Sequence, residues 1–471
     1  MLAYNFNSEG VTGQEMLPRL LFFVGTRPEI IKAAPLFHVL RKSSEVQVDL
    51  VHTGQHYDWN MSGIFIEELG LPTPIYHLGV GSGSQPFQIH EIIERAEEIV
   101  GTYLPDAILA VGDTNSTLAV AILSSKMDVP FIHIEAGLRS FDLTMPEEIN
   151  RRIADHVASL NFAPTERAAS NLLNEGYPPE RTFVTGNTIV DAVLRMLPKA
   201  RAQSNILKKL KIDPSKFLLT VTIHRRENAD NPERLESIIN ALIELKEVQI
   251  VWPLHPRTKG NMEKTDLLKR LYTAKHIKVT DPLPYLDFLK LLDSSTVVAT
   301  DSGGVQEEAA TLKIPCVVLR DSTERPEIID EGIGKMAGAD DLRIKRYVRD
   351  FLYNEALIER VKRAPNPFGD GSASIKISEI LLNWLEEGKI TISPPRFDSG
   401  APTYAAFIVN EEMSGHTVQD VEKGLVKIVS IYREDGGFVR PRAELTLKAR
   451  QIIRVLGEKP LMSEFRRTWN L

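Results

Sequence analysis

The sequence predicts an α/β protein of two facing doubly wound (Rossmann-like) domains, with a small α-rich appendage at the C-terminus. Three observations support this prediction. Short apolar runs of strand length alternate with helical segments. The alternation occurs in two series, at residues 19–185 and 217–319. In both series polar or charged residues directly follow several strands, and this edge of an open parallel sheet is where ligands bind.

Composition is that of an ordinary globular protein. The chain has 471 residues, of which 43% are hydrophobic and 25% charged, and this length suits two or three domains. A net charge of −7 argues against general binding to nucleic acid or to anionic membranes. Cys316 is the single cysteine, which excludes an intramolecular disulfide framework and a cysteine-rich metal site. We see no secretory signal and no membrane-spanning run, so we expect a cytoplasmic protein.

The two series set the expected domain limits. In order, the parts are a polar tail (1–17), a first α/β domain (18–187), a second α/β domain (188–371), a helix that rejoins the first domain (372–389) and an appended region (390–471). In the appended region, Val418–Ile431 and Leu445–Leu456 show helical periodicity. We therefore expect an α-rich unit that serves in dimerisation or partner binding.

Each series contains several expected strands. In the first domain they are Arg19–Val24, Val46–His52, Ala107–Val111, Val129–Ile134, Leu160–Ala163 and Thr182–Thr185. In the second domain they are Phe217–Ile223, Gln249–Pro253, Val297–Ala299 and Ile314–Leu319. Because helical segments separate them, these strands should lie parallel, and the two domains should face each other across a cleft.

Carboxylates gather at the strand ends of the first domain. Asp113 follows one expected strand after a single glycine, Glu135 directly follows another, and Glu147 begins the next expected helix. Carboxylates collected in one pocket can transfer protons. Two of them also have structural interpretations: Asp113 could cap the helix that follows it, and Glu147 could pair with Arg151 at i,i+4.

Cations and glycines occur where phosphate could bind. Arg27 and Lys32 flank the N-terminus of the first helix, where free N–H groups favour anions, although ordinary surface charge would also explain them. His224 and Arg225 follow the first strand of the second domain. They could form the cationic rim of a pocket or belong to a solvated loop. The segment Ser302-Gly303-Gly304 precedes a helix, and its glycines would let backbone N–H groups approach a pyrophosphate.

Two further residues each have more than one interpretation. Glu308, in the first turn of that helix, could accept hydrogen bonds from ribose hydroxyls or satisfy the helix dipole. His56, in the loop T-G-Q-H, is as readily a turn residue as a ligand.

No G-x-G-x-x-G follows the first strand of either domain and no G-x-x-x-x-G-K-[ST] occurs. Since the His, Asp and Glu spacings also lack a metal signature, we expect neither metal nor cofactor.

At these residues the chain resembles the non-hydrolysing UDP-N-acetylglucosamine 2-epimerases, which have the two-domain GT-B fold. The resemblance extends from about Leu20 to Ile390. The motifs that carry it are G-T-R-P-E-I-I-K (Gly25–Lys32), T-G-Q-H (Thr53–His56), G-D-T (Gly112–Thr114), I-E-A-G-L-R (Ile134–Arg139), P-E-E-I-N-R (Pro146–Arg151), H-R-R-E-N (His224–Asn228), D-S-G-G-V-Q-E-E (Asp301–Glu308), R-D-S-T-E-R-P-E (Arg320–Glu327) and N-P-F-G-D-G (Asn366–Gly371). It implies epimerisation at C2 of UDP-GlcNAc to UDP-ManNAc, by elimination and re-addition of UDP through a glycal.

The resemblance also implies two sets of site residues. The catalytic set is Asp113, Glu135, Glu147, Arg151 and His224. The UDP-sugar-binding set is Arg27, Lys32, His56, Arg225, Leu283, Phe288, Ser302, Gly303, Gly304, Glu308 and Arg325. In this set Phe288 would lie along the uracil, and Leu283 would offer it backbone groups.

One departure from the family concerns regulation. Many bacterial relatives bind an activating UDP-sugar through a basic residue after T-G-Q-H, but residues 43–94 contain no Lys or Arg here. We therefore expect activation by UDP-GlcNAc to be weak, since two diphosphates in one cleft need cations.

Three other functions stay open. The chain could epimerise a related UDP-diacetamido-uronic acid sugar, could be a GT-B UDP-sugar glycosyltransferase, or could be a catalytically silent UDP-sugar-binding regulator. The glycosyltransferase would need an acceptor and should not need three clustered acids, and the carboxylate set disfavours a silent regulator. The expected partner is a UDP-sugar, the expected assembly a homodimer, and the expected process the biosynthesis of cell surface polysaccharide.

Overall fold

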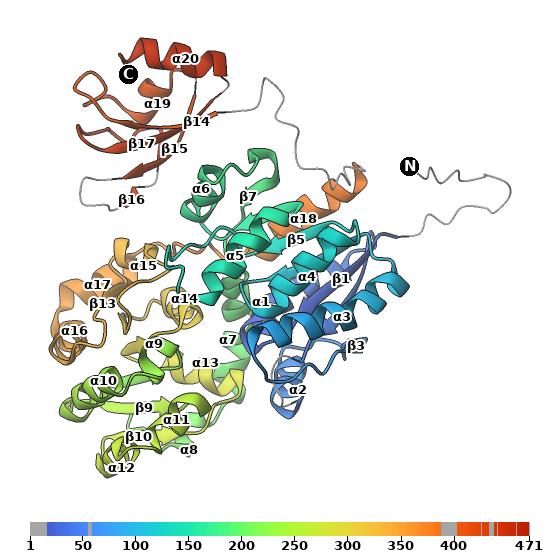
Figure 1. The fold of residues 1–471 in the computed structure, drawn as a ribbon. Coiled ribbons are helices and arrows are strands. Elements are labelled where there is room, and N and C mark those ends of the chain that lie inside the picture. The colour runs from blue at the N-terminus through green and yellow to red at the C-terminus, as the bar shows by residue number, and fades with distance from the viewer. Residues whose placement is uncertain are drawn as a thin grey trace.

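The computed structural model describes residues 17–54, 59–387, 403–424, 426–432, 438–439, 441–457 and 459–470. Two parallel sheets with helices on their faces lie side by side, and a separate small antiparallel sheet stands beyond α6 (Figure 1). The expected pair of doubly wound α/β units is confirmed.

The first sheet has seven parallel strands in the order β3-β2-β1-β4-β5-β6-β7. They are β1 Arg19–Val24, β2 Gln47–His52, β3 Tyr76–His77, β4 Ala107–Val111, β5 Phe131–Ile134, β6 Leu160–Ala163 and β7 Thr182–Val184. Its helices are α1 Arg27–Lys42, α2 Trp59–Glu68, α3 Gln85–Tyr103, α4 Asn115–Lys126, α5 Pro146–Val157 and α6 Glu166–Asn174, with the 3₁₀ turn η1 Pro179–Arg181. The central strand β4 is buried at every position, because helices cover both faces of the sheet.

The second sheet has six parallel strands in the order β10-β9-β8-β11-β12-β13. They are β8 Leu218–Thr222, β9 Gln249–Pro253, β10 Ile277–Thr280, β11 Val297–Thr300, β12 Cys316–Val318 and β13 Gly334–Met336. The helices that accompany it are α7 Thr188–Gln203, α8 Ile206–Lys209, α9 Arg226–Ala229, α10 Pro232–Glu244, α11 Pro256–Met262, α12 Leu267–Thr273, α13 Tyr285–Asp293, α14 Gly303–Leu312, α15 Glu327–Asp330, α16 Asp341–Tyr353 and α17 Glu355–Arg363. Cys316 is buried in β12, with its thiol pKa raised to about 12 by burial.

Every strand expected in the two α/β domains is present, and three short strands are additional. These three, β3, β10 and β13, are all edge strands. These three short strands are covered less completely than central ones, so they lack the continuous apolar run by which most of the others were predicted. In β13, for example, two of the three residues are only partly buried.

The second unit is tied back to the first through helices. The helix α18 (Ala373–Glu386) lies where a helix was expected at 372–389, and it packs against α1. The helix α7 packs against both α1 and α14. Residues of both units therefore share one continuous hydrophobic core.

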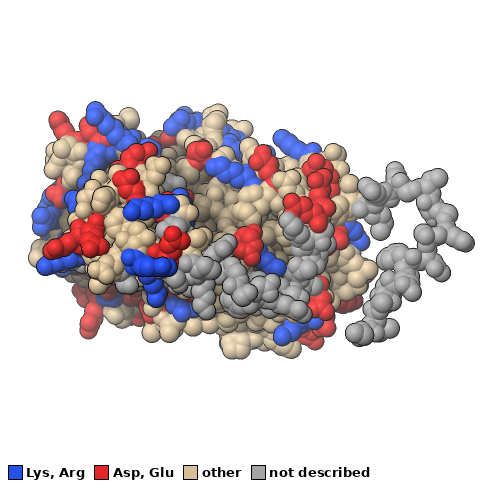
Figure 2. Space-filling model, turned by 90° about the horizontal axis from the view of Figure 1, so that it is seen from above, with Lys and Arg blue, Asp and Glu red and all other residues tan. Residues whose placement is uncertain are grey.

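Two general surface properties agree with the composition. Blue and red side chains are interspersed on the face shown in Figure 2, and the described residues form no large patch of one sign there. None of the helices in the described part of the chain is both long and apolar enough to cross a membrane.

The expectation of an α-rich appendage is wrong. The described C-terminal residues form an antiparallel sheet in the order β14-β17-β15-β16, accompanied by two helices. Its elements are β14 Thr403–Ile408, α19 Val418–Glu422, β15 Lys427–Tyr432, β16 Phe438–Val439, β17 Ile452–Gly457 and α20 Lys459–Thr468. Each of the two segments with helical periodicity ends in a strand, because K-I-V-S-I-Y and I-I-R-V-L-G are rich in β-branched residues that favour pleated structure.

This appended sheet has a hydrophobic core of its own. Phe465 and Met462 on α20 pack with Ile453 and Val455 of β17, and this buried cluster contains no residue of the two α/β units. The sheet nevertheless touches the rest of the molecule, since β15 lies against α6.

We predict that Phe465→Ala destabilises the appended sheet selectively. Phe465 is fully buried in that core, and removing such a ring costs about 3–5 kcal/mol. Hydrogen exchange measured by mass spectrometry should show lost protection in β14, β15 and β17 and unchanged protection in β4 and β8. Equal loss of protection in all of these strands would show that the appended sheet does not unfold as a separate unit.

Candidate active site

Two neighbouring strands bring the first two carboxylates together. The strand β4 pairs with β5 so that Val111 lies beside Ile134. Asp113 and Glu135 follow these residues, at the same edge of the sheet. Glu147 belongs to the first turn of α5. The juxtaposition expected for the strand ends is therefore present.

Asp113 pairs with an arginine and does not cap a helix. Its Oδ2 atom lies 2.6 Å from Arg151 Nη2 and accepts a hydrogen bond from Arg151 Nε at 2.8 Å. Thr114 is the N-cap of α4, so the capping interpretation of Asp113 is wrong. Burial alone would raise the pKa of Asp113, but the charges of Arg151, Arg225 and Arg325 outweigh it and place that pKa below its usual value. Asp113 is held ionised.

Glu147 pairs with the second unit. Its Oε1 atom accepts a hydrogen bond from Arg225 Nη1 at 3.0 Å. The interpretation of Glu147 as the i,i+4 partner of Arg151 is wrong, because Arg151 reaches Asp113 and, at 3.1 Å, Glu148. The contact with Arg225 thus joins α5 of the first unit to the residue before α9 of the second.

Glu135 lies among cations in a backbone conformation that is rare for residues other than glycine. Its φ angle is +69°. The carboxylate contacts Lys32 Nζ, and it accepts hydrogen bonds from Arg325 Nη2 at 2.9 Å and Asn187 Nδ2 at 3.3 Å. Arg139, its near neighbour in sequence, pairs instead with Asp155. Burial raises the pKa of Glu135, and Lys32 offsets this rise only in part.

A buried polar cluster supports the backbone on both sides of these carboxylates. His133 contacts Asp155 Oδ1 at 2.7 Å through Nδ1 and the carbonyl of Gly112 at 2.8 Å through Nε2. Asp155 also accepts from the N–H of Gly137 at 3.2 Å. Gly137 has φ +80°, and a Cβ there would lie 2.2 Å from the carbonyl oxygen of Ala168. The position after Glu135 and Ala136 therefore needs glycine.

The second unit supplies Arg325 and the N-terminus of α14. Arg325 Nε donates to Glu307 Oε1 at 2.8 Å, and Lys32 Nζ lies 3.1 Å from Glu307 Oε2. Ser302 caps α14 by accepting from the N–H of Val305. A Cβ on Gly303 would lie 2.7 Å from Arg325 Cζ, whereas a Cβ on Gly304 would meet nothing within 4 Å. The helix N-terminus is thus covered by one guanidinium group and approachable at Gly304.

Arg27 contacts two aromatic rings, and one of them, Phe288, is the ring expected along the uracil. The Cζ atom of Arg27 is 4.7 Å from the ring centroid of Phe65 and 5.3 Å from that of Phe288. Its Nη1 donates to the carbonyl of Leu283 at 3.3 Å. Burial raises the pKa of Glu308 to about 7, although the nearby charge of Arg27 lowers it. The structure therefore brings these residues, expected to bind the UDP portion, into one partly buried group.

His224 is held at the end of the second sheet. Its backbone N–H donates to Asp301 at 3.0 Å, and its Nδ1 lies 3.3 Å from the same carboxylate. Its ring packs on His255 with centroids 5.6 Å apart. His56 lies outside the described residues.

Sequence reasoning missed Glu324. This side chain is fully buried, and Arg151, Arg225, Arg320 and Arg325 surround it. Burial would raise the pKa of Glu324, but these four charges place it well below the usual value. A glutamate within the polar stretch R-D-S-T-E-R-P-E carries no sequence signal of burial, and only the arginines on both sides suggest it.

The expectation of weak activation stays a prediction. Arg95 directly follows the range without Lys or Arg, and its Nη1 donates to the carbonyl of Leu78 at 2.5 Å. The adjacent Gly79 packs on Gly54 of the T-G-Q-H loop. Arg95 is therefore a cation near this loop, and it already pairs with Glu91.

A cavity of about 480 Å³ separates the two units beside Glu324. One side is formed by Leu138–Phe141 and α6, and the other by Thr323, Glu324, Pro326 and Glu327. The expected cleft between facing domains is therefore present at this edge.

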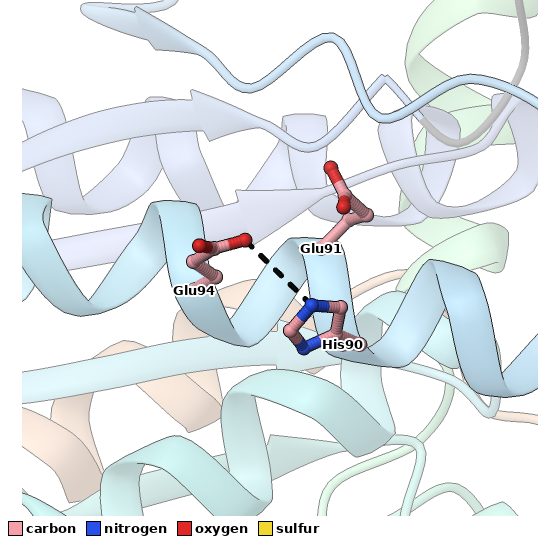
Figure 3. A group of neighbouring side chains, drawn as sticks. All are labelled: His90, Glu91 and Glu94. Atoms are coloured by element: carbon pink, nitrogen blue, oxygen red, sulfur yellow. Dashed lines mark ion pairs between the residues drawn. The ribbon is translucent and has the colours of Figure 1, made fainter.

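One group of possible metal ligands occurs among the described residues. His90, Glu91 and Glu94 lie on one side of α3 (Figure 3), with His90 Nε2 at 3.8 Å from Glu94 Oε2. His90 and Glu94 are exposed, and Glu91 already pairs with Arg95. Ordinary ion pairs on a helix surface account for this group.

Comparison with known proteins agrees with this geometry. The family model described as UDP-N-acetylglucosamine 2-epimerase matches residues 38–382. The UDP-N-acetylglucosamine 2-epimerase of Methanocaldococcus jannaschii is 42% identical over 369 residues, which is 77% of this chain and 98% of that protein. The UDP-2,3-diacetamido-2,3-dideoxy-D-glucuronate 2-epimerase of Pseudomonas aeruginosa is 38% identical over 77% of this chain and 99% of that protein.

Solved structures show the same fold. The M. jannaschii UDP-GlcNAc 2-epimerase in complex with UDP-GlcNAc and UDP superposes with a TM-score of 0.73, covering 78% of this chain and 99% of that one. The Neisseria meningitidis enzyme bound to UDP-GlcNAc, 33% identical, gives 0.72 and covers 78% of this chain and 100% of that one. With this coverage and identity, and with the paired sheets of the GT-B fold, the chain belongs to the UDP-N-acetylglucosamine 2-epimerase family.

Proposed function

We propose that the protein interconverts UDP-GlcNAc and UDP-ManNAc by inverting C2 of the sugar. The main support for this proposal is that three carboxylates at one sheet edge each contact a cation, and that these cations come from both units. Such a site combines proton transfer with stabilisation of a leaving diphosphate. Membership of the family and the UDP-GlcNAc complexes of its relatives support this proposal.

The reaction follows from the chemistry of C2. This carbon is not α to a carbonyl, so its proton is not acidic enough for simple removal. Loss of the C2 proton to a base, together with cleavage of the C1–O bond to UDP, gives a glycal and the UDP anion. UDP then re-adds at C1 while C2 receives a proton on the opposite face, so that atoms and charge balance over the cycle.

The two strand-end carboxylates have environments suited to different roles. The arginine charges around Asp113 lower its pKa and keep it ready to accept a proton, whereas burial raises the pKa of Glu135. A diphosphate that took Lys32 and Arg325 from Glu135 would raise that pKa further, because both cations favour the ionised carboxylate. Two acids with opposite pKa shifts are the usual arrangement of an acid–base pair.

Deuterium incorporation tests this function. The protein is incubated with UDP-GlcNAc in deuterated water, and the products are analysed by NMR. UDP-ManNAc carrying deuterium at C2 is the expected result. Transfer of GlcNAc to an acceptor without C2 exchange would indicate a glycosyltransferase, and binding of UDP-GlcNAc without exchange would indicate a silent regulator.

The diacetamido-uronate sugar is the second candidate substrate. It is favoured by the 38% identity to the P. aeruginosa enzyme named for that sugar. The same NMR experiment with both sugars as competing substrates compares their kcat/KM values directly.

The wider setting is also a proposal. We place the enzyme in the cytoplasm, where it would supply an activated sugar for cell surface polysaccharide, and we propose that it acts as a homodimer. The support for a dimer is that β14 is an edge strand of the appended sheet and carries Ile408, which is 64% exposed. Such an edge is suited to pairing with a second copy.

The dimer proposal is tested by light scattering. The full chain should have twice the mass of one chain, and Ile408→Lys should lower the dimer fraction by placing a charge on the exposed edge. A monomeric wild type, or a variant that dimerises as strongly as the wild type, would contradict pairing through β14.

We predict that Asp113→Asn, Glu135→Gln and Glu147→Gln each lower kcat by ~10²-fold or more, the scale of positioned acid–base catalysis. UDP affinity should change little, because the cations remain. Steady-state kinetics and calorimetry with UDP measure the two effects. Asp293→Asn is the control, since that surface carboxylate pairs with Arg201 away from the site. If one of the three variants kept normal turnover, the substituted residue would have a structural role and no catalytic one.

We predict that Glu308→Gln stabilises the unliganded protein at pH 8 and not at pH 4. Burial raises the folded-state pKa of Glu308 from 4.5 to about 7, so folding disfavours its ionised form. The resulting destabilisation is absent below pH 4.5, grows between these values and is complete above pH 7. Thermal unfolding at the two pH values checks this. A lower Tm for the variant at pH 8 would mean that the ionised carboxylate is stabilised in place.

A further inference from the structure

We infer that Glu324 is a positioning residue for the epimerisation, because its carboxylate holds together the arginines that pair with the three candidate catalytic carboxylates. The inference rests on the proposed function. It adds a residue that neither the motifs nor the strand-end pattern had placed in the site.

One carboxylate oxygen of Glu324 lies near the guanidinium groups of three arginines. Its Oε1 atom lies 2.7 Å from Arg325 Nη1, 3.2 Å from Arg225 Nη2 and 3.8 Å from Arg151 Nη2. Arg151 belongs to α5 of the first unit, whereas Arg225 and Arg325 belong to the second. Glu324 therefore lies where the two units meet.

Each of these arginines also contacts a candidate catalytic carboxylate. The pairs are Arg151 with Asp113 at 2.6 Å, Arg225 with Glu147 at 3.0 Å and Arg325 with Glu135 at 2.9 Å. A guanidinium group is planar and rigid, so the position of one edge determines the position of the other. The location of Glu324 is in this way transmitted to all three carboxylates.

The other oxygen of Glu324 is anchored separately. Its Oε2 atom lies 2.5 Å from Arg320 Nη1, and Arg320 Nε donates to Glu227 at 2.9 Å. Among the described residues, Arg320 forms ion pairs with Glu227 and Glu324 and with none of the three candidate catalytic carboxylates. It therefore orients Glu324 without taking part in the three arginine–carboxylate pairs.

Charge explains why an acid is needed at this point. Arg151, Arg225 and Arg325 approach one another closely, and like charges in a buried site repel strongly. The single negative charge of Glu324 compensates this repulsion. A neutral side chain of the same shape would leave the arginines free to separate, and a displacement of 1 Å in a catalytic group can cost ~10²-fold in rate.

The experiment compares Glu324→Gln with Glu227→Gln. The first removes the charge shared by the three arginines, and the second removes a carboxylate from Arg320 alone. We expect Glu324→Gln to lower kcat for C2 exchange by ~10²-fold. The KM for UDP-GlcNAc and the Kd for UDP should change much less than kcat, because Arg225 and Arg325 keep their charge. Glu227→Gln should keep wild-type kcat.

Glu324→Asp separates positioning from folding. It keeps the charge but withdraws the carboxylate by one methylene, so it should fold as the wild type does and recover part of the activity that Glu324→Gln loses. If Glu324→Gln does not yield folded protein, Glu324→Asp decides alone: a reduced kcat with unchanged UDP affinity supports the inference, and wild-type kcat overturns it.

The remaining outcomes are also decisive. Wild-type kcat in Glu324→Gln, or a loss that appears only in KM and UDP affinity, would overturn the positioning role while leaving the proposed function intact. A wild-type protein that exchanges no C2 hydrogen would instead remove the proposed function, and the positioning role with it.

Discussion

Buried charge is the constraint on which the site depends. Arg325, Glu324, Glu307 and Glu135 are all almost fully removed from water at the junction of the two parallel sheets. An unpaired ion in such a place costs several kcal/mol, so each of these groups must find a partner of opposite sign. The partners come from both units, with Lys32 on α1 and Arg325 beyond β12. The electrostatics of the site therefore favour the arrangement in which the two sheets lie together.

The same constraint shapes ligand binding. In the unliganded protein Lys32 and Arg325 neutralise Glu135 and Glu307, and the proposed substrate would bring a diphosphate that competes for these cations. Such a competition couples the two halves of the reaction. In the proposed mechanism, bound UDP would leave Glu135 less neutralised, so that its carboxyl would hold a proton more readily for donation to C2.

Sequence reasoning found most of the fold because parallel central strands are continuous apolar runs, and it found Asp113 and Glu135 because they end two such runs. It could not find the partners of Glu147 or Glu324. Those pairings join residues 78 and 99 positions apart, and no local spacing encodes them. The prediction for the appended region was wrong for a different reason, since the apolar spacing of Leu445–Leu456 is compatible with a helix and with a strand. There the β-branched content was the better guide.

The contact between Glu147 and Arg225 suggests how the site is completed. Glu147 lies in the first turn of α5, but its cationic partner precedes α9 on the other unit. Any motion that separated the two sheets would break this contact and the link from Arg151 to Glu324, whereas Asp113 would keep Arg151. In a separated state the third carboxylate would lack its cationic partner until the two units closed. Chemistry would be confined to the closed state, where the glycal and UDP are shielded from water.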